Sequence, residues 1–146
     1  FLSLMAKNAL QNPPPLTFFR NFVIEKDGEH KDAFNIKARA MMPLTDAARV
    51  LILGHQVNGI NNTFKRFEKL AELESNYSEL FEQAADAYEM LIRYRALQGL
   101  KNKDTGKYLN PADLSKMQRL NLRNSFRPIS ELQEILRIRF QVNFFN

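Results

Sequence analysis

The sequence predicts a mainly α-helical domain, a bundle of about five helices with a long kinked C-terminal helix and at most a short β-hairpin near residues 22–36. Three observations lead to this fold class. Apolar residues recur at steps of three and four through most of the chain, which is the period of a helix that buries one face. Runs with β propensity occur at two places alone, Phe22–Ile24 and Phe34–Ile36. The length of 146 residues suits one hydrophobic core, so residues 1–146 are expected to form a single domain.

A first helix is expected from the start of the chain to Asn12. Apolar residues from Leu2 to Leu10 already follow helical spacing, and the run Pro13–Pro15 then removes consecutive backbone donors. The connector behind the prolines, with Phe18-Phe19, should lie on the core. Because the helical pattern is in place from the first residue, we expect the chain to be a piece of a longer protein, with residues 1–12 the end of a helix shared with a preceding domain.

A polar turn centred on Asp27-Gly28 separates the two β-prone runs, and Pro43 then opens a second helix. The apolar residues of this helix form a broad stripe, so we expect it to be the most buried element. They are Leu44, Ala47, Ala48, Val50, Leu51, Ile52 and Leu53. Gly54 ends the helix, and His55 is expected there as a capping or core-edge residue rather than a catalyst.

A third, short amphipathic helix should begin with Asn62 or Thr63 as its cap. Asn76 and Glu79 have the spacing of a capping box for a fourth helix. The apolar residues of the fourth helix recur at alternating four- and three-residue steps, as in the seam of a bundle. They are Leu80, Ala84, Ala87, Leu91 and Tyr94.

A polar loop over residues 101–107 precedes the last element. Asn110-Pro111, and then Ser115 with Gln118 as a capping box, are successive helix start signals. From there a helical period continues for about seven turns and is interrupted at Pro128. This pattern allows one kinked helix or two nearly collinear helices, and we favour the kink.

Composition argues against several kinds of site. With no cysteine and only His30 and His55 at no ligand-like spacing, neither a disulfide nor a metal site is expected. No apolar run approaches the roughly 18 residues of a membrane span and no secretory signal is visible, so we expect a cytoplasmic protein without membrane contact.

The net charge of +5 is uneven, because residues 1–92 hold 10 Lys and Arg against 12 Asp and Glu, whereas residues 93–146 hold 11 against 4. The C-terminal third is the basic pole.

The stretch from residue 22 to residue 49 is the strongest candidate for function. Its polar turn and the helix start behind it carry polar and charged side chains where irregular backbone and a helix N-terminus can meet a partner domain or an anionic group. These side chains are Glu29, His30, Lys31, Lys37, Arg39, Asp46 and Arg49. The alternative is a solvated hairpin, with Asp46 and Arg49 forming an ordinary ion pair within a helix. The run Glu29–Asp32 does not predict an active site by itself, since adjacent residues rarely face one substrate.

A second hypothesis assigns function to the basic pole. Lys116, Arg119, Arg123 and Arg127 lie at steps of three and four and would form one basic stripe along the last helix. Such a stripe suits an interaction or nucleic-acid-binding module. A solvated basic face explains the same pattern, and nucleic acid is not the partner that we favour. A stand-alone enzyme is the third class, but no phosphate-binding loop, nucleophile elbow or His-Glu-x-x-His motif is present.

Ordered landmarks along nearly the whole chain resemble those of a known family. They are Phe19-Arg20-Asn21-Phe22-Val23, Gly28-Glu29-His30-Lys31-Asp32, Asn35-Ile36-Lys37, Pro43-Leu44, Asp46-x-x-Arg49, Arg93-Tyr94-Arg95, Tyr108-Leu109-Asn110-Pro111, Leu114-Ser115, Leu122 and Phe126-Arg127-Pro128-Ile129. This set resembles the bacterial family of nucleotidyltransferase substrate-binding domains. The resemblance adds Arg20, Arg93 and Arg95 to the candidate binding residues. The chain departs from the family pattern at Ala96-Leu97, where family members commonly carry His-Gln.

The resemblance implies a helical domain that follows a nucleotidyltransferase domain, in signal-transduction proteins that often carry a CBS-pair or cyclic-nucleotide-binding regulatory domain. The upstream domain of such a protein holds Mg²⁺ and a nucleoside triphosphate through a Gly-Ser motif and an Asp-x-Asp pair. Neither motif occurs here, so we expect no catalytic residue, metal ligand or cofactor in this chain. The expected role is to complete the substrate pocket of the upstream domain. An apolar patch on the first helix should be exposed, which leaves a homodimer open.

Overall fold

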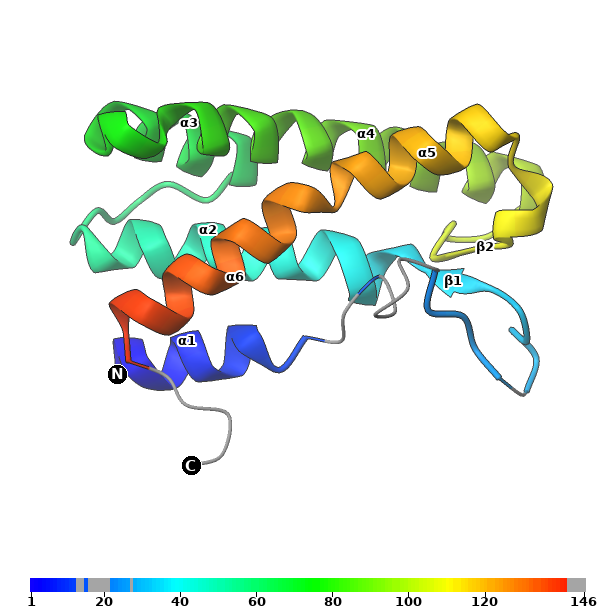
Figure 1. Cartoon of the computed structure of the whole chain (residues 1–146), viewed down its shortest axis with the longest axis horizontal. Helices are drawn as coiled ribbons and strands as arrows, with labels where there is room; N and C mark the ends of the chain where they lie inside the picture. Colours follow the sequence, from blue (N-terminus) through cyan, green and yellow to red (C-terminus); the bar gives the residue numbers. More distant parts are fainter. Residues whose placement is uncertain (13–14, 16–21, 27, 142–146) are drawn as a thin grey trace.

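The computed structural model describes residues 1–12, 15, 22–26 and 28–141, and 70% of these residues are helical (Figure 1). The described chain contains six α-helices: α1 (Leu2–Leu10), α2 (Met42–Gly54), α3 (Thr63–Leu73), α4 (Ser78–Asn102), α5 (Lys116–Ser125) and α6 (Arg127–Arg139). Three short turns are also helical: the π-helical η1 (Lys37–Met41) and the 3₁₀ turns η2 (Ser75–Tyr77) and η3 (Pro111–Asp113). Two strands, β1 (Phe34–Asn35) and β2 (Tyr108–Leu109), complete the described elements. The prediction of a mainly α-helical fold is confirmed.

The helices form two layers that a third element crosses (Figure 1). α1 and α2 lie side by side in one layer, and α3 packs against the first half of α4 in the other. α5 lies against α4, and α6 continues from it diagonally across the bundle to reach α1 and α2. The strand pair occupies one end of the bundle. At the other end α1 meets the end of α6, where Ser3 Oγ donates a hydrogen bond to Phe140 O at 3.4 Å.

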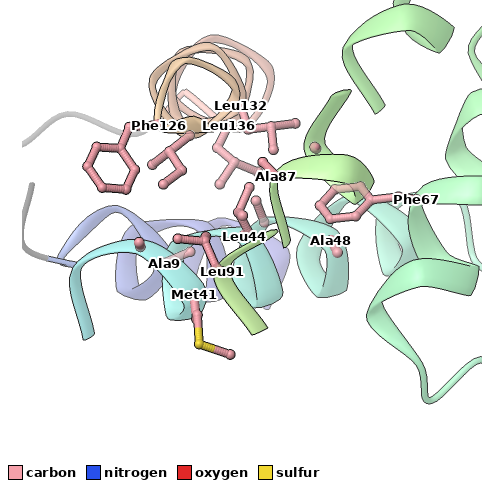
Figure 2. Packing of buried hydrophobic residues seen from close by; sticks show 14 of the residues in the cluster. Ala9, Met41, Leu44, Ala48, Phe67, Ala87, Leu91, Phe126, Leu132 and Leu136 are labelled. Atoms are coloured by element: carbon pink, nitrogen blue, oxygen red, sulfur yellow. The ribbon is translucent and has the colours of Figure 1, made fainter. Parts of the chain in front are cut away.

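α2 lies at the centre of the core and is in contact with α1, α3 and α6. Seven of its 13 residues are buried, more than in any other described helix, which confirms the prediction for this element. Figure 2 shows Leu132 and Leu136 of α6 on one side of the core, with Leu44 and Ala48 of α2 on the other. Full burial of a leucine side chain stabilises the fold by about 1.5–3 kcal/mol, so this contact between the layers is a major source of stability.

Most of the predicted helix starts are confirmed by their hydrogen bonds. Asn62 caps α3 by accepting from Lys65 N at 3.1 Å, and the capping box of Ser115 and Gln118 at the start of α5 is complete. The predicted capping box of Asn76 with Glu79 is wrong. The turn η2 occupies this position, and α4 begins behind it at Ser78 without a side-chain cap.

At most a short hairpin was predicted near residues 22–36. This stretch does fold back on itself, since Glu25 N donates to Ala33 O at 2.9 Å and Asp32 N donates to Glu25 O at 2.8 Å, but its strand β1 pairs with a distant segment. β1 pairs antiparallel with β2, with Phe34 opposite Leu109 and Asn35 opposite Tyr108. Aromatic rings pack behind this strand pair. Phe22 packs edge-on against Phe34 at 5.3 Å and against Phe126 at 5.9 Å between ring centroids, so its buried ring joins β1 to the break between α5 and α6.

The end of α1 and the bend of the C-terminal helix differ slightly from the sequence prediction. α1 ends at Leu10 rather than Asn12, because the Asn12 side chain donates to Ala9 O at 2.8 Å and to Asp46 Oδ2 at 2.9 Å. The C-terminal helix bends by only 18° at the break between α5 and α6. Pro128 lies in the first turn of α6, where a missing backbone N–H removes no helical hydrogen bond, so the predicted kink is present but small. The connector with Phe18-Phe19 lies outside the described residues.

Three helix ends meet at Glu74, which caps the end of α3. Its carboxylate accepts two hydrogen bonds from the Arg139 guanidinium, at 2.7 and 2.9 Å, and lies 2.8 Å from His55 Nε2. Burial raises the pKa of Glu74, but the hydrogen bonds from Arg139 and His55 outweigh burial and bring its pKa below the usual value. His55 caps α2, as the sequence predicted.

Replacing Glu74 with Gln should lower the free energy of unfolding by about 1 kcal/mol at pH 7, because the pair with Arg139 is partly open to water. The pKa of Glu74 is lowered in the folded state, so its contribution is complete above the usual value of 4.5 and is lost as the pH falls through the lowered pKa. Urea unfolding between pH 3 and pH 7 measures both effects. Glu72→Gln, which alters an exposed pair with Lys69, is the matched control, and equal losses in the two variants would contradict the assigned role.

Candidate functional site

The strand pair brings distant parts of the sequence to one end of the bundle. Ile36 N, directly after β1, donates to Lys107 O at 2.8 Å, directly before β2. The loop between α4 and β2 then packs back against α4, where Arg95 Nε donates to Thr105 O at 2.9 Å. Residues 35–37, 93–95 and 107–110, which are separated by long stretches of chain, are therefore neighbours at this end (Figure 1).

Two glycines allow the loop to touch the backbone of α4. A Cβ on Gly106, which has a φ of +71°, would lie 1.9 Å from Arg95 O and 2.8 Å from Gly99 N. A Cβ on Gly99 would lie 2.8 Å from Asp104 O. Asp104 closes the loop, since its N–H donates to Gly99 O at 3.0 Å and its Oδ1 accepts from Gly106 N at 2.7 Å. No other residue fits at these two contacts, so the loop is held rigidly.

A groove of about 850 Å³ lies between η1 and the second half of α4, and the loop closes it at one end. Its apolar wall consists of Met41, Tyr88, Ile92, Ala96, Gly99 and Leu100. Its polar rim consists of Arg95, Lys103, Asp104 and Thr105. The π-helical turn η1 supplies Met41 to this wall, and π-helical turns within helices are often found at functional sites.

Several of the residues predicted from the sequence gather at this end of the molecule. Arg95 lines the groove, and Lys37 and Arg39 lie in η1, the same turn that supplies Met41. The His30 ring stacks on Tyr108 of β2, with ring centroids 3.8 Å apart and an interplanar angle of 5°. The exposed residues Glu29 and Lys31 lie beside His30, in the loop before β1.

Other predicted site residues lie elsewhere. Asp46 accepts from Asn12 Nδ2 at 2.9 Å and lies 3.7 Å from Arg49, so this pair belongs to the contact between α1 and α2. Arg49 also affects Arg66 on α3. Burial lowers the pKa of Arg66, and the nearby positive charge of Arg49 lowers it further. Arg93 is exposed and pairs with Glu89 at 2.8 Å, one turn away on α4. Arg20 lies outside the described residues.

Two of the four side chains in the predicted basic stripe are exposed, and the other two are half-buried. Arg119 Nη1 donates to Pro111 O at 3.2 Å and to Leu114 O at 2.7 Å, which holds η3 against α5. The Arg123 guanidinium lies 5.1 Å from the centroid of the Phe22 ring, and its buried Nε has no hydrogen-bond partner among the described residues. Arg127 pairs with Glu131, and Lys116 is exposed. Two of the four cations therefore hold the fold together, which weakens the case for a nucleic-acid interface.

Most of the groove was not predicted from the sequence. Its apolar wall was assigned to the ordinary helical pattern, and residues 101–107 were predicted only as a polar loop. The spacing of Gly99 and Gly106 around this loop is the signal that was available, because glycines often mark a close approach of two backbone segments.

The described part of the chain contains no cluster of three or more His, Cys, Asp or Glu side chains that could hold a metal ion. None of the helices described above combines the length and the apolar character that crossing a membrane requires.

Comparison with protein families identifies the chain. The family described as "Putative nucleotidyltransferase substrate binding domain" matches residues 1–140. The chain belongs to this family. The match covers every helix and strand described above, and it agrees with the resemblance carried by the landmarks in the sequence. No curated protein and no solved structure gives a significant match to this substrate-binding domain.

Replacing Gly106 with Ala should lower the free energy of unfolding by about 2–4 kcal/mol, since the new Cβ overlaps Arg95 O and the backbone is left-handed. Gly59→Ala is the matched control, because Gly59 also has a positive φ of +85° but has no atom within 4 Å of a new Cβ. The control should lose only about 1–2 kcal/mol. Urea unfolding measures both variants, and equal losses would show that the close contact with α4 is unimportant.

Replacing Arg119 with Gln should reduce stability by about 1–2 kcal/mol, because two backbone carbonyls lose their donor. Binding to a random oligonucleotide should stay weak, with a dissociation constant of roughly 10⁻⁴ M or poorer at about 150 mM salt. Lys116→Gln, an exposed member of the same stripe, is the control and should alter neither property. Sub-micromolar oligonucleotide binding that both substitutions reduce would support the nucleic-acid hypothesis instead.

Proposed function

We propose that this domain completes the substrate pocket of a nucleotidyltransferase domain in the same protein and holds the acceptor of the transferred nucleotide. Membership of the substrate-binding family over residues 1–140 is the observation that carries the proposal. The groove supports it, because a cavity with an apolar wall and a few converging polar groups is the usual form of a small-molecule site. Arg95, a landmark of the family resemblance, lines this groove.

Under this proposal the nucleotidyltransferase domain carries out the reaction, and the present domain binds the acceptor. In nucleotidyl transfer a nucleophile of the acceptor attacks the α-phosphorus of a nucleoside triphosphate, the bond from this phosphorus to the bridging oxygen breaks, and pyrophosphate leaves. Mg²⁺ bound by paired carboxylates neutralises the charge that develops, and the proposal assigns the metal and the nucleotide to the nucleotidyltransferase domain. The contribution of the present domain is to bind and orient the acceptor, which lowers the entropic cost of the reaction.

The proposal also includes the context that the family resemblance implies. The protein would act in signal transduction, with a CBS-pair or cyclic-nucleotide-binding domain that regulates the transfer. The residues on the side of the groove that faces the nucleotidyltransferase domain would include Lys37 and Arg39 of η1 and the turn around His30, since these lie at the same end of the bundle as the groove.

The 146-residue domain alone, incubated with Mg²⁺ and each of the four nucleoside triphosphates labelled at the α-phosphate, should transfer no label to a deproteinised metabolite extract. A longer protein that includes the preceding reading frame should transfer it, and that frame should encode a Gly-Ser motif and an Asp-x-Asp pair. Transfer by the domain alone that His30→Ala abolishes would overturn the division of roles, as would a preceding frame without these motifs.

In the longer protein, Arg95→Gln should raise the KM for the acceptor about tenfold and change kcat little, because it removes binding rather than chemistry. Arg93→Gln is the matched control. Arg93 lies two positions away on the same helix, is exposed and pairs with Glu89, so the KM should not change. Equal KM values in the two variants would place the acceptor elsewhere.

A further inference from the structure

The wall of the groove leaves large apolar side chains in contact with water. Leu100 is 80% exposed and Ile92 is 37% exposed, although both lie on a helix whose other face is buried in the core. A ligand that covered these side chains would remove apolar surface from water, which is favourable. Tyr88 adds an aromatic edge to this wall, and its ring is held by Phe64 of α3 at 5.2 Å between centroids.

The rim of the groove places positive charge beside this apolar wall. The Arg95 guanidinium is oriented by its hydrogen bond from Nε to Thr105 O, and the groove residues described here supply no acceptor for its terminal nitrogens. Lys103, the left-handed cap of α4 with a φ of 57°, is exposed at the same rim. Asp104, the one carboxylate of the rim, accepts a hydrogen bond from Gly106 N and keeps its negative charge, so the two cations and this one carboxylate leave the rim with a net charge of +1. An anion is therefore the group that best fits the rim.

The backbone of the rim is held in place before any ligand binds. Contacts of Gly99 and Gly106 fix the loop on α4, and the pairing of β1 with β2 fixes the position of the chain behind the loop. Such preorganisation reduces the entropic cost of binding. The groove volume of about 850 Å³ lies within the range of small-molecule sites.

We propose that the groove binds a small amphipathic anion, with an apolar, preferably planar body over Ile92 and Leu100 and a carboxylate, phosphate or sulfonate at Arg95 and Lys103. As a statement about the acceptor of nucleotidyl transfer, this inference rests on the proposed function. As a statement about binding, it depends on the groove alone. Neutral polyhydroxylated acceptors, which offer neither an apolar body nor an anion, are excluded as ligands of this site.

The fluorescent probe 8-anilinonaphthalene-1-sulfonate tests the inference directly, because it combines aromatic rings with one anionic group. Its fluorescence should rise on binding to the folded domain. Leu100→Ser should weaken binding about tenfold, and so should Arg95→Gln, while Lys103→Gln should weaken it about threefold. Lys103 has an exposed side chain, so its substitution tests the charge without disturbing the hydrogen bond that Arg95 makes with the loop.

Each variant has a matched control on α4. Leu97→Ser changes a leucine that is 64% exposed but does not line the groove, and Arg93→Gln changes an exposed arginine that does not line it. Lys101→Gln is the control for Lys103→Gln, because it changes a lysine in the last turn of α4 that does not line the groove. These three controls should bind the probe like the unchanged domain. The neutral analogue N-phenyl-1-naphthylamine should respond to Leu100→Ser but not to the charge substitutions.

The outcomes separate the possibilities. If Leu97→Ser and Leu100→Ser have equal effects, the probe adheres to general apolar surface and the groove is not a site. If the charge substitutions change neither probe, the anionic part of the inference is wrong. Failure of nucleotidyl transfer by the longer protein with probe binding intact would overturn the proposed function and leave the groove as a binding site. Intact transfer without selective probe binding would overturn the groove alone.

Discussion

Burial of α2 on three sides is the constraint on which the rest of this structure depends. α1, α3 and α6 each pack against it, and small residues such as Ala47 and Ala48 let these neighbours approach closely. The helix is short, and in isolation a helix of 13 residues is only marginally stable. Its position is therefore decided by packing. Because η1 runs directly into α2, the same packing also places η1, which forms one side of the groove.

The other side of the groove depends on a contact between two backbones. Gly99 and Gly106 have no side chain, so the loop after α4 can lie directly on the helix and lead the chain into β2. β2 then pairs with β1, which leads into η1. The groove is thus bordered by elements that hold one another in register, and this arrangement suits a site that must present fixed charges to a ligand.

The distribution of arginines shows why charge along the sequence does not predict a binding surface. The basic C-terminal third holds 11 Lys and Arg, but several of its arginines serve the fold. Arg119 binds the carbonyls of η3, Arg123 lies against Phe22, and Arg139 joins α6 to Glu74 at the opposite end of the bundle. Arg95 and Lys103 differ from these residues because they border a groove. The charges that border the groove are therefore a small part of the basic pole, and they could be recognised only from the surroundings of each side chain.

The sequence by itself determined the features that depend on near neighbours in the chain. These include the helical period, the cap of α3 at Asn62, the capping box of Ser115 and Gln118, and the position of Pro128 in the first turn of α6. Their energies arise within one or two turns, so they can be read from local patterns. Arg95, one of the family landmarks, lines the groove.

Only the tertiary structure decided which distant segments meet. The pairing of Phe34 with Leu109 and the burial of Phe22 against Phe126 join residues that lie 75 and 104 positions apart, and no local propensity specifies them. For this reason β propensity identified the strand at Phe34–Asn35 but not its partner. The partners of Asp46 and Arg49 were also decided by the structure, in which the two side chains lie 3.7 Å apart and Asp46 accepts a hydrogen bond from Asn12. The physical cause is the same throughout: long-range contacts are chosen by the burial of apolar surface over the whole core, not by the residues on either side.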